Sequence, residues 1–267
     1  MNPVVCIPTF NEELNIKKCL NKLRWVKKIF ILDGKSTDKT IKIANKFKNT
    51  KVIKVKKNLD YVSKLNYLLK INKKKWVFIL DADYVLSKGL INEVKKINFE
   101  DYEKKNIFGF RIKIYNKIYN TIIKEDIYPK KILLFKNNNC YYKKIGHSEK
   151  LIIKSEILNL KNFLVHENLN DFKKFSEWKN NQKKYSLKDS KKICETNILK
   201  LRPQDTTRRF PPVNLILLFL YLVLIKKIFI YGKAGFYYLF QRLYYELLLS
   251  ISIIKNYFLK IKFIIRF

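Results

Sequence analysis

The sequence has few cysteines, and their spacing fits neither a metal site nor a disulfide framework. Cys6, Cys19, Cys140 and Cys194 lie far apart, without a C-x-x-C pair. This indicates neither a zinc site nor a set of disulfides, so we expect reduced thiols in a cytosolic protein. We expect no signal peptide, because an apolar strand pattern follows Met1 almost directly.

Acidic residues are also scarce. The chain has 57 Lys+Arg against 22 Asp+Glu, a formal net charge of +35. Such an excess suggests a polyanionic partner, which can be a nucleic acid, an anionic membrane surface or a phosphorylated substrate. The lysines are spread over the whole chain, however, as compositional drift would also leave them. The charge alone leaves these explanations open.

What is present is a globular pattern of short apolar runs that alternate with helical patterns. The expected strands are Val4–Ile7, Ile29–Leu32, Val52–Val55 and Trp76–Leu80. The expected helices are Glu12–Leu23 with Asn11 as N-cap, Thr37–Phe47, and a helical stretch before Trp76. This alternation predicts an α/β fold with a mostly parallel sheet and helices on both faces.

The second half of the chain has a different texture. Strand-like runs such as Ile132–Phe135 and Leu151–Ile153 predict a subregion that completes the sheet. A charged helix is expected over Asp171–Lys192, with a buried side formed by Phe172, Phe175, Trp178 and Tyr185.

From Phe210 onward the chain is apolar and basic. Val213–Ile225 is uninterrupted by charge, but at ~1.5 Å per residue it spans only about 20 Å, against about 30 Å for a bilayer core. Apolar residues from Phe236 to Ile261 then recur at spacings of three and four, among Lys and Arg. This pattern favours helices lying on an anionic membrane surface. Helices packed on the rest of the protein, or a spanning helix, are the alternatives.

Three segments carry chemistry, and each follows an expected strand: PTFNEE from Pro8, DGKSTD from Asp33 and DAD from Asp81. Ligands of open parallel sheets bind at this edge. A helix starting after Phe10 would aim its amide N–H groups at an anion, and Asp33 could read a base. Asp81 and Asp83 are costly to hold together unless a cation lies beside them.

At these spacings the three segments resemble glycosyltransferase family 2 with the GT-A fold. GHSEKL around Glu149, LVHENLNDFKKF around His166 and the Gly232–Phe236 segment resemble the lipopolysaccharide-core glucosyltransferase branch. The resemblance implies an inverting, metal-dependent hexosyltransferase that moves a sugar from a nucleotide-sugar donor, expected to be a UDP-hexose. The implied acceptor is a hydroxyl of a lipid-linked or lipopolysaccharide-type saccharide.

The resemblance also implies roles for individual residues. The residues implied for nucleotide-sugar binding are Pro8, Thr9, Phe10, Glu12, Asp33, Lys64, Asp81 and Ala82. Asp83 and Asp81 would hold Mn²⁺ or Mg²⁺, with His166 as a further candidate ligand, and Glu149 would be the general base. The family's basic residue before an asparagine falls on Leu65, before Asn66, so Lys64 would substitute for it.

We therefore expect a catalytic domain over residues 1–205, with a nucleotide-binding half at 1–100 and an acceptor-side half at 101–205. Residues 206–267 would form a membrane-associating helical region, which predicts a peripheral or monotopic protein on the cytoplasmic face of the inner membrane. Transfer to a polyprenyl phosphate is the alternative reaction, and a non-enzymatic basic nucleic-acid- or membrane-binding protein is the rival class. No nucleic-acid-binding motif is visible in the sequence, so no nucleic-acid partner is expected.

Overall fold

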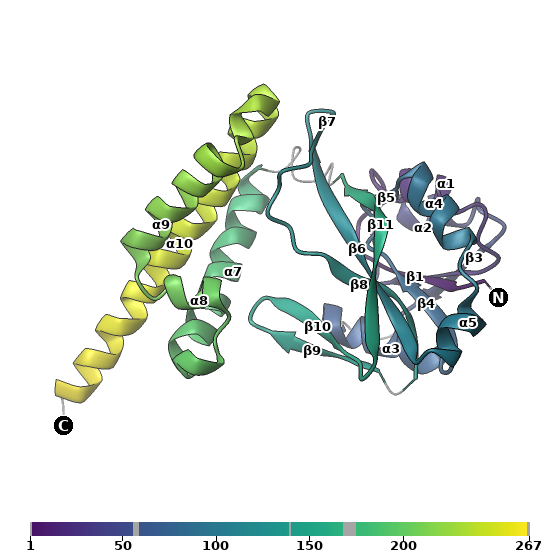
Figure 1. Cartoon of the computed structure of the whole chain (residues 1–267), viewed down its shortest axis with the longest axis horizontal. Coiled ribbons are helices and arrows are strands. Elements are labelled where there is room, and N and C mark those ends of the chain that lie inside the picture. The colour runs from purple at the N-terminus through teal and green to yellow at the C-terminus, as the bar shows by residue number, and fades with distance from the viewer. Residues whose placement is uncertain (1, 56–58, 139, 168–174, 266–267) are drawn as a thin grey trace. The chain divides into compact units, whose positions relative to one another are not determined.

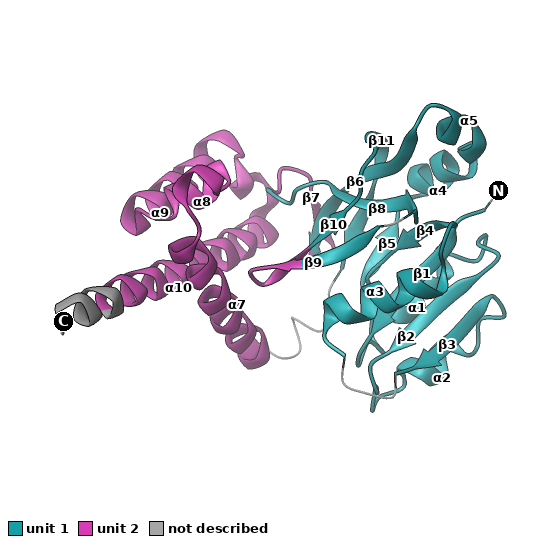
Figure 2. Ribbon diagram, turned by 90° about the horizontal axis from the view of Figure 1, so that it is seen from below, with its two compact units in different colours: residues 1–117, 127–143, 150–173 teal, residues 118–126, 144–149, 174–267 magenta. Residues whose placement is uncertain are grey.

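The computed structural model describes residues 2–55, 59–138, 140–167 and 175–265, with side chains up to residue 258. Contacts divide the chain into two compact units (Figure 2). Unit 1 comprises residues 1–117, 127–143 and 150–173, and unit 2 comprises residues 118–126, 144–149 and 174–267. The boundary expected near residue 205 differs from this division, because the residues just before it, from 174 onward, belong to the same unit as residues 206–267.

The first half of unit 1 is a parallel sheet. Its strands are β1 (Val4–Thr9), β2 (Ile29–Asp33), β3 (Thr50–Lys54) and β4 (Trp76–Ile79). They lie in the order β3-β2-β1-β4, and each neighbouring pair is parallel. The four expected strands are confirmed to within two residues at either end. Their carboxyl ends therefore share one edge of the sheet.

The rest of the sheet is mixed. It continues from β4 through β8 (Lys131–Lys136), β6 (Ile107–Ile118), β11 (Glu156–His166) and β5 (Tyr84–Leu86). The pairs β4–β8, β8–β6 and β11–β5 are antiparallel, whereas β6–β11 is parallel. The ninth strand is β7 (Thr121–Ile123), and β9 (Tyr141–Ile145) pairs separately with β10 (Ser148–Ile152). The α/β fold class is thus confirmed, with a parallel first half and a mixed second half.

Alternation along the strands builds a core on each face of the sheet. Val5, Ile7 and Phe78 face the helices α1 (Ile16–Asn21), α2 (Thr40–Ala44), α4 (Lys88–Lys95) and α5 (Phe99–Lys104). Cys6, Leu32 and Val77 face α3 (Tyr61–Ile71) and the β9–β10 hairpin on the other side (Figure 1). Successive strand residues point to opposite faces, so both sides of these strands are apolar.

The loop after β1 departs from the sequence-based expectation. The helix expected over Glu12–Leu23 covers only Ile16–Asn21, and Asn15, not Asn11, is its N-cap residue. Asn11 has φ 55°, a left-handed conformation that asparagine tolerates. The expected Thr37–Phe47 helix is likewise reduced to Thr40–Ala44. In both places, hydrogen bonds between the two loops replace the first turn of the expected helix.

Unit 2 contains α7 (Phe175–Glu195), α8 (Pro203–Thr207), α9 (Pro211–Leu220) and α10 (Gly232–Ile265). Helix α10 packs along both α7 and α9. Trp178 is buried as expected and Tyr185 is half-buried, but Phe175 is 43% exposed. The start of the expected helix at residues 171–174, with Phe172, lies outside the described residues.

The apolar run Val213–Ile225 does not form one straight helix. After α9 the chain continues as a π-helical turn over Tyr221–Ile225 and a 3-10 turn over Ile228–Tyr231. In the described part of the chain, no single helix has the length and apolar character to cross a bilayer. One bent pair, Pro211–Ile225 with Ile228–Phe258 at 66°, meets the criteria of length and composition together.

A candidate donor and metal site at the sheet edge

The loops after β1 and β2 are bonded to each other. The backbone N–H of Asn11 donates to Ser36 Oγ at 2.9 Å, that of Glu12 to Thr40 Oγ1 at 2.7 Å, and that of Glu13 to Asp38 Oδ2 at 3.0 Å. These three amides therefore form hydrogen bonds within the protein. We expected a helix N-terminus here to direct its N–H groups at an anion, and that expectation is wrong for this reason.

Asp33 ends β2 beside Thr9 of β1. Its side chain is fully buried and accepts hydrogen bonds from the Ser36 N–H at 3.0 Å, the Ser36 hydroxyl at 2.5 Å and the Thr9 hydroxyl at 3.4 Å. The carboxylate that was predicted to bind a base is thus held rigidly at the strand end. Its role in reading the base remains a prediction.

Lys64 covers this strand end from α3. Its Nζ lies 5.9 Å from the centre of the Phe10 ring, and a Cβ added at Gly34 would come within 2.2 Å of it. Burial lowers the pKa of Lys64, while the charge of Asp33 opposes that shift. Leu65, in contrast, is buried in the core. The structure thus places the Lys64 ammonium at this strand end, and its role in donor binding stays a prediction. Phe10 is 55% exposed, which leaves a ring face for stacking.

The Asp81–Asp83 segment follows β4 and turns back into β5. The Leu80 N–H donates to the Cys6 carbonyl at 3.0 Å, and the Tyr84 N–H to the Asp81 carbonyl at 3.0 Å. The hydroxyl of Tyr61 donates to Asp81 Oδ1. Ala82 is buried, whereas Asp81 and Asp83 on either side of it are half-buried.

Asp83 and His166 meet across the β5–β11 ladder, in which His166 pairs with Tyr84. Asp83 Oδ2 lies 3.0 Å from His166 Nε2, and His166 Nδ1 lies 3.2 Å from Asn116 Oδ1. Burial acts to lower the pKa of His166, but the charge and hydrogen bond of Asp83 outweigh it and raise the pKa to about 10. The structure thus brings the predicted His166 into contact with the predicted metal ligand.

The other oxygen of Asp83 has no bond of its own. Among the described residues, Asp83 Oδ1 is buried without a hydrogen-bond partner. Glu12 lies near enough for its pKa to be raised to about 7, mainly by burial and further by the charges of Asp83 and Asp81, against a hydrogen bond from Asn15. The carboxyl groups of Glu12 and Asp81 therefore lie near enough to influence, or be influenced by, Asp83, whose Oδ1 is unsatisfied among the described residues.

This arrangement fits a divalent cation, although the described residues contain no group of three or more His, Cys, Asp or Glu side chains placed to hold a metal alone. Mg²⁺ and Mn²⁺ sites of nucleotide-dependent enzymes use one or two carboxylates and complete the shell with phosphate oxygens and water. A buried, unpaired carboxylate oxygen is costly unless such a partner arrives. The donor set at Asp83 is therefore suited to a metal that comes with a diphosphate.

Comparison with known proteins agrees with this geometry. The family model described as "Glycosyl transferase family 2" matches residues 4–157, more than half of the chain. The chain belongs to this glycosyl transferase family.

The family relatives match only in part. An uncharacterized glycosyltransferase of Rickettsia bellii is 33% identical over 109 residues, which cover 40% of this chain and 36% of that protein. An uncharacterized protein of Methanocaldococcus jannaschii is 29% identical over 58% of this chain and 72% of its own length. The chain thus aligns with little more than a third of its Rickettsia relative.

Solved structures show the same family fold. The mannosyltransferase PcManGT from Pyrobaculum calidifontis, in complex with GDP-Man and Mn²⁺, superposes with a TM-score of 0.56 at 12% identity. The alignment covers 96% of this chain and 87% of that one. This likeness establishes the GT-A fold.

Several residues that contact the predicted site residues were not predicted from the sequence. Glu167 accepts from Lys18 at 2.9 Å and from Lys117 at 3.0 Å, and its N–H donates to the Asp83 carbonyl at 3.0 Å. Tyr61 donates to Asp81, and Asn116 contacts His166. Only the adjacency of Glu167 to His166 gave a signal in the sequence.

The predicted base, Glu149, lies on β10 near the tip of the β9–β10 hairpin, and residues 144–149 of this hairpin belong to unit 2. The tip is bonded to α7. His147 Nδ1 lies 2.5 Å from Asp189 Oδ2, the His147 N–H donates to Asp189 Oδ1 at 2.9 Å, and the ring stacks on Tyr185. These contacts give His147 a structural role at the hairpin tip. The catalytic role of Glu149 stays a prediction.

Proposed function

We propose that the chain is an inverting glycosyltransferase that moves a hexose from a nucleotide-sugar, expected to be a UDP-hexose, to a hydroxyl of a lipid-linked or lipopolysaccharide-type saccharide. The observation that carries this proposal is the unpaired buried oxygen of Asp83 beside Asp81 and Glu12. Acidic side chains gathered in this way at the carboxyl edge of a sheet bind a cation and a diphosphate together.

Each part of the donor has a partner at this edge. The exposed ring of Phe10 stacks on the base, with Lys64 and Asp33 beside it, and Pro8 and Thr9 form the floor at the end of β1. Asp81, braced by Tyr61, faces the ribose, and Glu12 accepts or donates a hydrogen bond to the nucleoside. The GDP-Man bound by the structural relative supports the donor class.

Asp83 and Asp81 would hold Mn²⁺ or Mg²⁺, and His166 would orient Asp83 through its 3.0 Å contact. When bound, such a cation offsets the charge that develops on the leaving diphosphate. Ligands of this kind depend on partners that fix their orientation. The Asn116 contact to the far ring nitrogen of His166 serves that purpose.

In the reaction, the acceptor oxygen bonds to the anomeric carbon as the bond from that carbon to the diphosphate breaks. Glu149 takes the hydroxyl proton, a step of the kind that contributes about 10²–10⁴-fold. Attack opposite the leaving group inverts the anomeric configuration. Both electrons of the broken bond leave with the nucleoside diphosphate.

The tail supports a location at the cytoplasmic face of the inner membrane, bound peripherally or monotopically. Residues 206–267 contain ten Lys and Arg but one acidic residue, Glu246. Glu246 is 5% exposed and is paired with Arg208. Basic residues next to exposed apolar side chains bind anionic membranes.

A panel of UDP-, GDP- and dTDP-sugars with Mn²⁺ or Mg²⁺ tests this function. At saturation, the matching donor should raise the melting temperature by about 5 °C or more and be turned over only with metal present. The Asp83→Asn variant should lose both effects, whereas Glu156→Gln, which removes an exposed carboxylate from β11, should keep them. Stabilisation by no donor in the presence of either metal would refute the proposal.

A further inference from the structure

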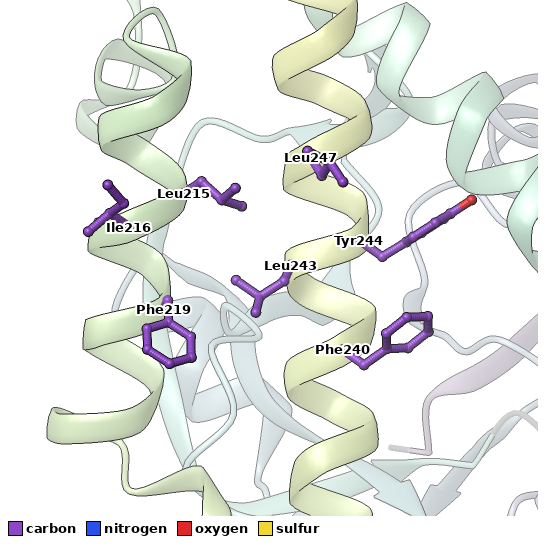
Figure 3. Close-up of a pocket in the computed structure, with 7 residues that line it drawn as sticks. All are labelled: Leu215, Ile216, Phe219, Phe240, Leu243, Tyr244 and Leu247. Carbon is purple, nitrogen blue, oxygen red and sulfur yellow. The ribbon is translucent and has the colours of Figure 1, made fainter.

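Helices α9 and α10 enclose an apolar groove of about 480 Å³. It is lined by Leu215, Ile216, Phe219, Phe240, Leu243, Tyr244 and Leu247. Figure 3 shows Leu215 and Leu243 projecting from the two helices into the space between them, and the Tyr244 hydroxyl directed away from α9. That hydroxyl carries the only polar side-chain atom in the lining. The groove therefore offers nothing to recognise a sugar or a phosphate.

The groove opens on a surface that is costly to expose to water. Ile216 is 60% exposed, and other large apolar side chains are exposed on α9, on α10 and in the π-helical turn after α9. Those outside the groove include Val213, Leu217, Leu220, Leu224, Phe236, Ile251 and Phe258. Exposed apolar side chains in this number mark a contact with another apolar body.

The groove is preformed, because buried contacts fix both of its walls. Arg208 and the Asn214 side chain of α9 both donate to Glu246 of α10, Arg208 Nε at 3.1 Å and Asn214 Nδ2 at 3.1 Å. On the other side of α10, the ring of Trp178 from α7 lies 6.2 Å from that of Phe240 and 5.4 Å from that of Tyr244. A ligand would not have to order either wall, which favours binding.

Charge decides which apolar body fits. With ten basic residues against the single, buried and paired Glu246, the tail would repel a second copy of itself. It would attract an amphiphile that carries anionic groups beside its hydrocarbon. Lys226 and Lys227, at the bend after α9, are placed to meet such groups at the membrane surface.

We propose that the groove between α9 and α10 binds one hydrocarbon chain of the acceptor's lipid anchor. This inference rests on the proposed function, because that function is what makes the bound lipid an acceptor. The evidence for the chain-binding site itself is the groove. Its purpose is to hold the anchor so that the attached saccharide stays with the enzyme. Acceptors without a chain then bind more weakly.

An alkyl glucoside with a diazirine in its chain, used below its micelle-forming concentration with the full-length protein, tests the site. After illumination, mass spectrometry should find cross-links concentrated on residues 215–219 and 240–247. Ile216→Gln combined with Leu243→Gln should weaken labelling about tenfold, since two apolar contacts with hydrocarbon are lost. Leu224→Gln, at a side chain 63% exposed outside the groove, should leave the labelling unchanged.

Ile216→Gln alone serves if the double variant does not fold, because its side chain is already 60% exposed. Labelling spread evenly over all exposed apolar residues, Leu224 and Phe258 included, would overturn the site. So would chain-to-chain cross-links through the groove, which would make a second copy its occupant. If no nucleotide-sugar binds but the groove labelling persists, the proposed transferase falls and the lipid site stands.

Discussion

Asp83 and His166 lie 83 residues apart in sequence, yet Asp83 Oδ2 and His166 Nε2 are 3.0 Å apart. The contact leaves Asp83 Oδ1 as a buried oxygen with no hydrogen-bond partner among the described residues. One oxygen of the carboxylate is thus bonded within the protein, and the proposed cation would bind the other.

We predict that His166→Ala lowers Mn²⁺ affinity about 10–100-fold, because partners that orient a metal ligand typically have effects of this size. Mn²⁺ titration of both proteins with UDP present, followed by electron paramagnetic resonance, measures the change. An unchanged affinity would show that Asp83 needs no support from the imidazole.

Glu12 should make stability depend on pH. Burial, followed by the charges of Asp83 and Asp81, raises the pKa of Glu12 from 4.5 to about 7 in the folded protein. The folded state therefore favours protonated Glu12, and this stabilisation is complete below pH 4.5 and lost as the pH rises through 7. Relative to wild type, Glu12→Gln should thus be more stable at pH 8 than at pH 5.

Urea unfolding of both proteins at pH 5 and pH 8, with EDTA present, checks this sign. Glu156→Gln is the matched control, since it makes the same change at an exposed position. A stability difference between Glu12→Gln and wild type that stays constant with pH would contradict the placement of Glu12 beside the acidic cluster.

Gly235 is required by a close backbone approach. A Cβ at this position would lie 1.9 Å from the carbonyl oxygen of Ile228, and backbone cannot swing aside as a side chain can. Gly235→Ala should therefore destabilise the protein by about 1–3 kcal/mol, as overpacking does.

Gly34→Ala provides the contrast. A Cβ at Gly34 would meet the far end of the flexible Lys64 side chain, which can move away, and would reach the Thr9 carbonyl oxygen only at 3.1 Å. We expect a smaller loss of stability there, with weaker nucleotide binding. Equal thermal denaturation losses for the two variants would count against the geometry at Gly235.

Lys226 and Lys227 should anchor the tail to anionic lipid. At about 1 kcal/mol per basic residue, Lys226→Gln with Lys227→Asn should weaken binding to phosphatidylglycerol vesicles about thirtyfold at low salt. Asparagine is chosen because Lys227 has φ 47°. Co-sedimentation measures the change, and Lys104→Gln with Lys105→Gln in unit 1 is the charge-matched control. An equal loss in both variants would make the attraction a property of net charge alone.

The positions of the first four strands could be predicted because each is a short segment rich in apolar residues and bounded by polar ones. Their parallel order then placed Asp33 and Asp81 at the same edge of the sheet, on either side of β1. This part of the site follows from local pattern and the connection rules of α/β sheets.

What depended on contacts between distant segments could not be predicted. The loop bonds from Asn11, Glu12 and Glu13 to residues 36–40 shortened both expected helices. The pairing of His166 with Asp83 required the antiparallel β5–β11 ladder, which no local pattern reveals. Likewise, the periodicity of α7 gave no means of distinguishing the exposed Phe175 from the buried Trp178.

We propose that Asp83 offers Oδ1, which has no hydrogen-bond partner among the described residues, to a metal that arrives with a nucleoside diphosphate. Calorimetric titration of UDP and GDP into the wild-type, Asp83→Asn and Glu156→Gln proteins, each with and without Mn²⁺, tests this proposal. We predict tight, Mn²⁺-dependent binding of one nucleotide to wild type and Glu156→Gln, and binding at least about tenfold weaker to Asp83→Asn, a loss of at least about 1.4 kcal/mol. Binding to Asp83→Asn that is as tight and as Mn²⁺-dependent as in wild type would contradict the claim.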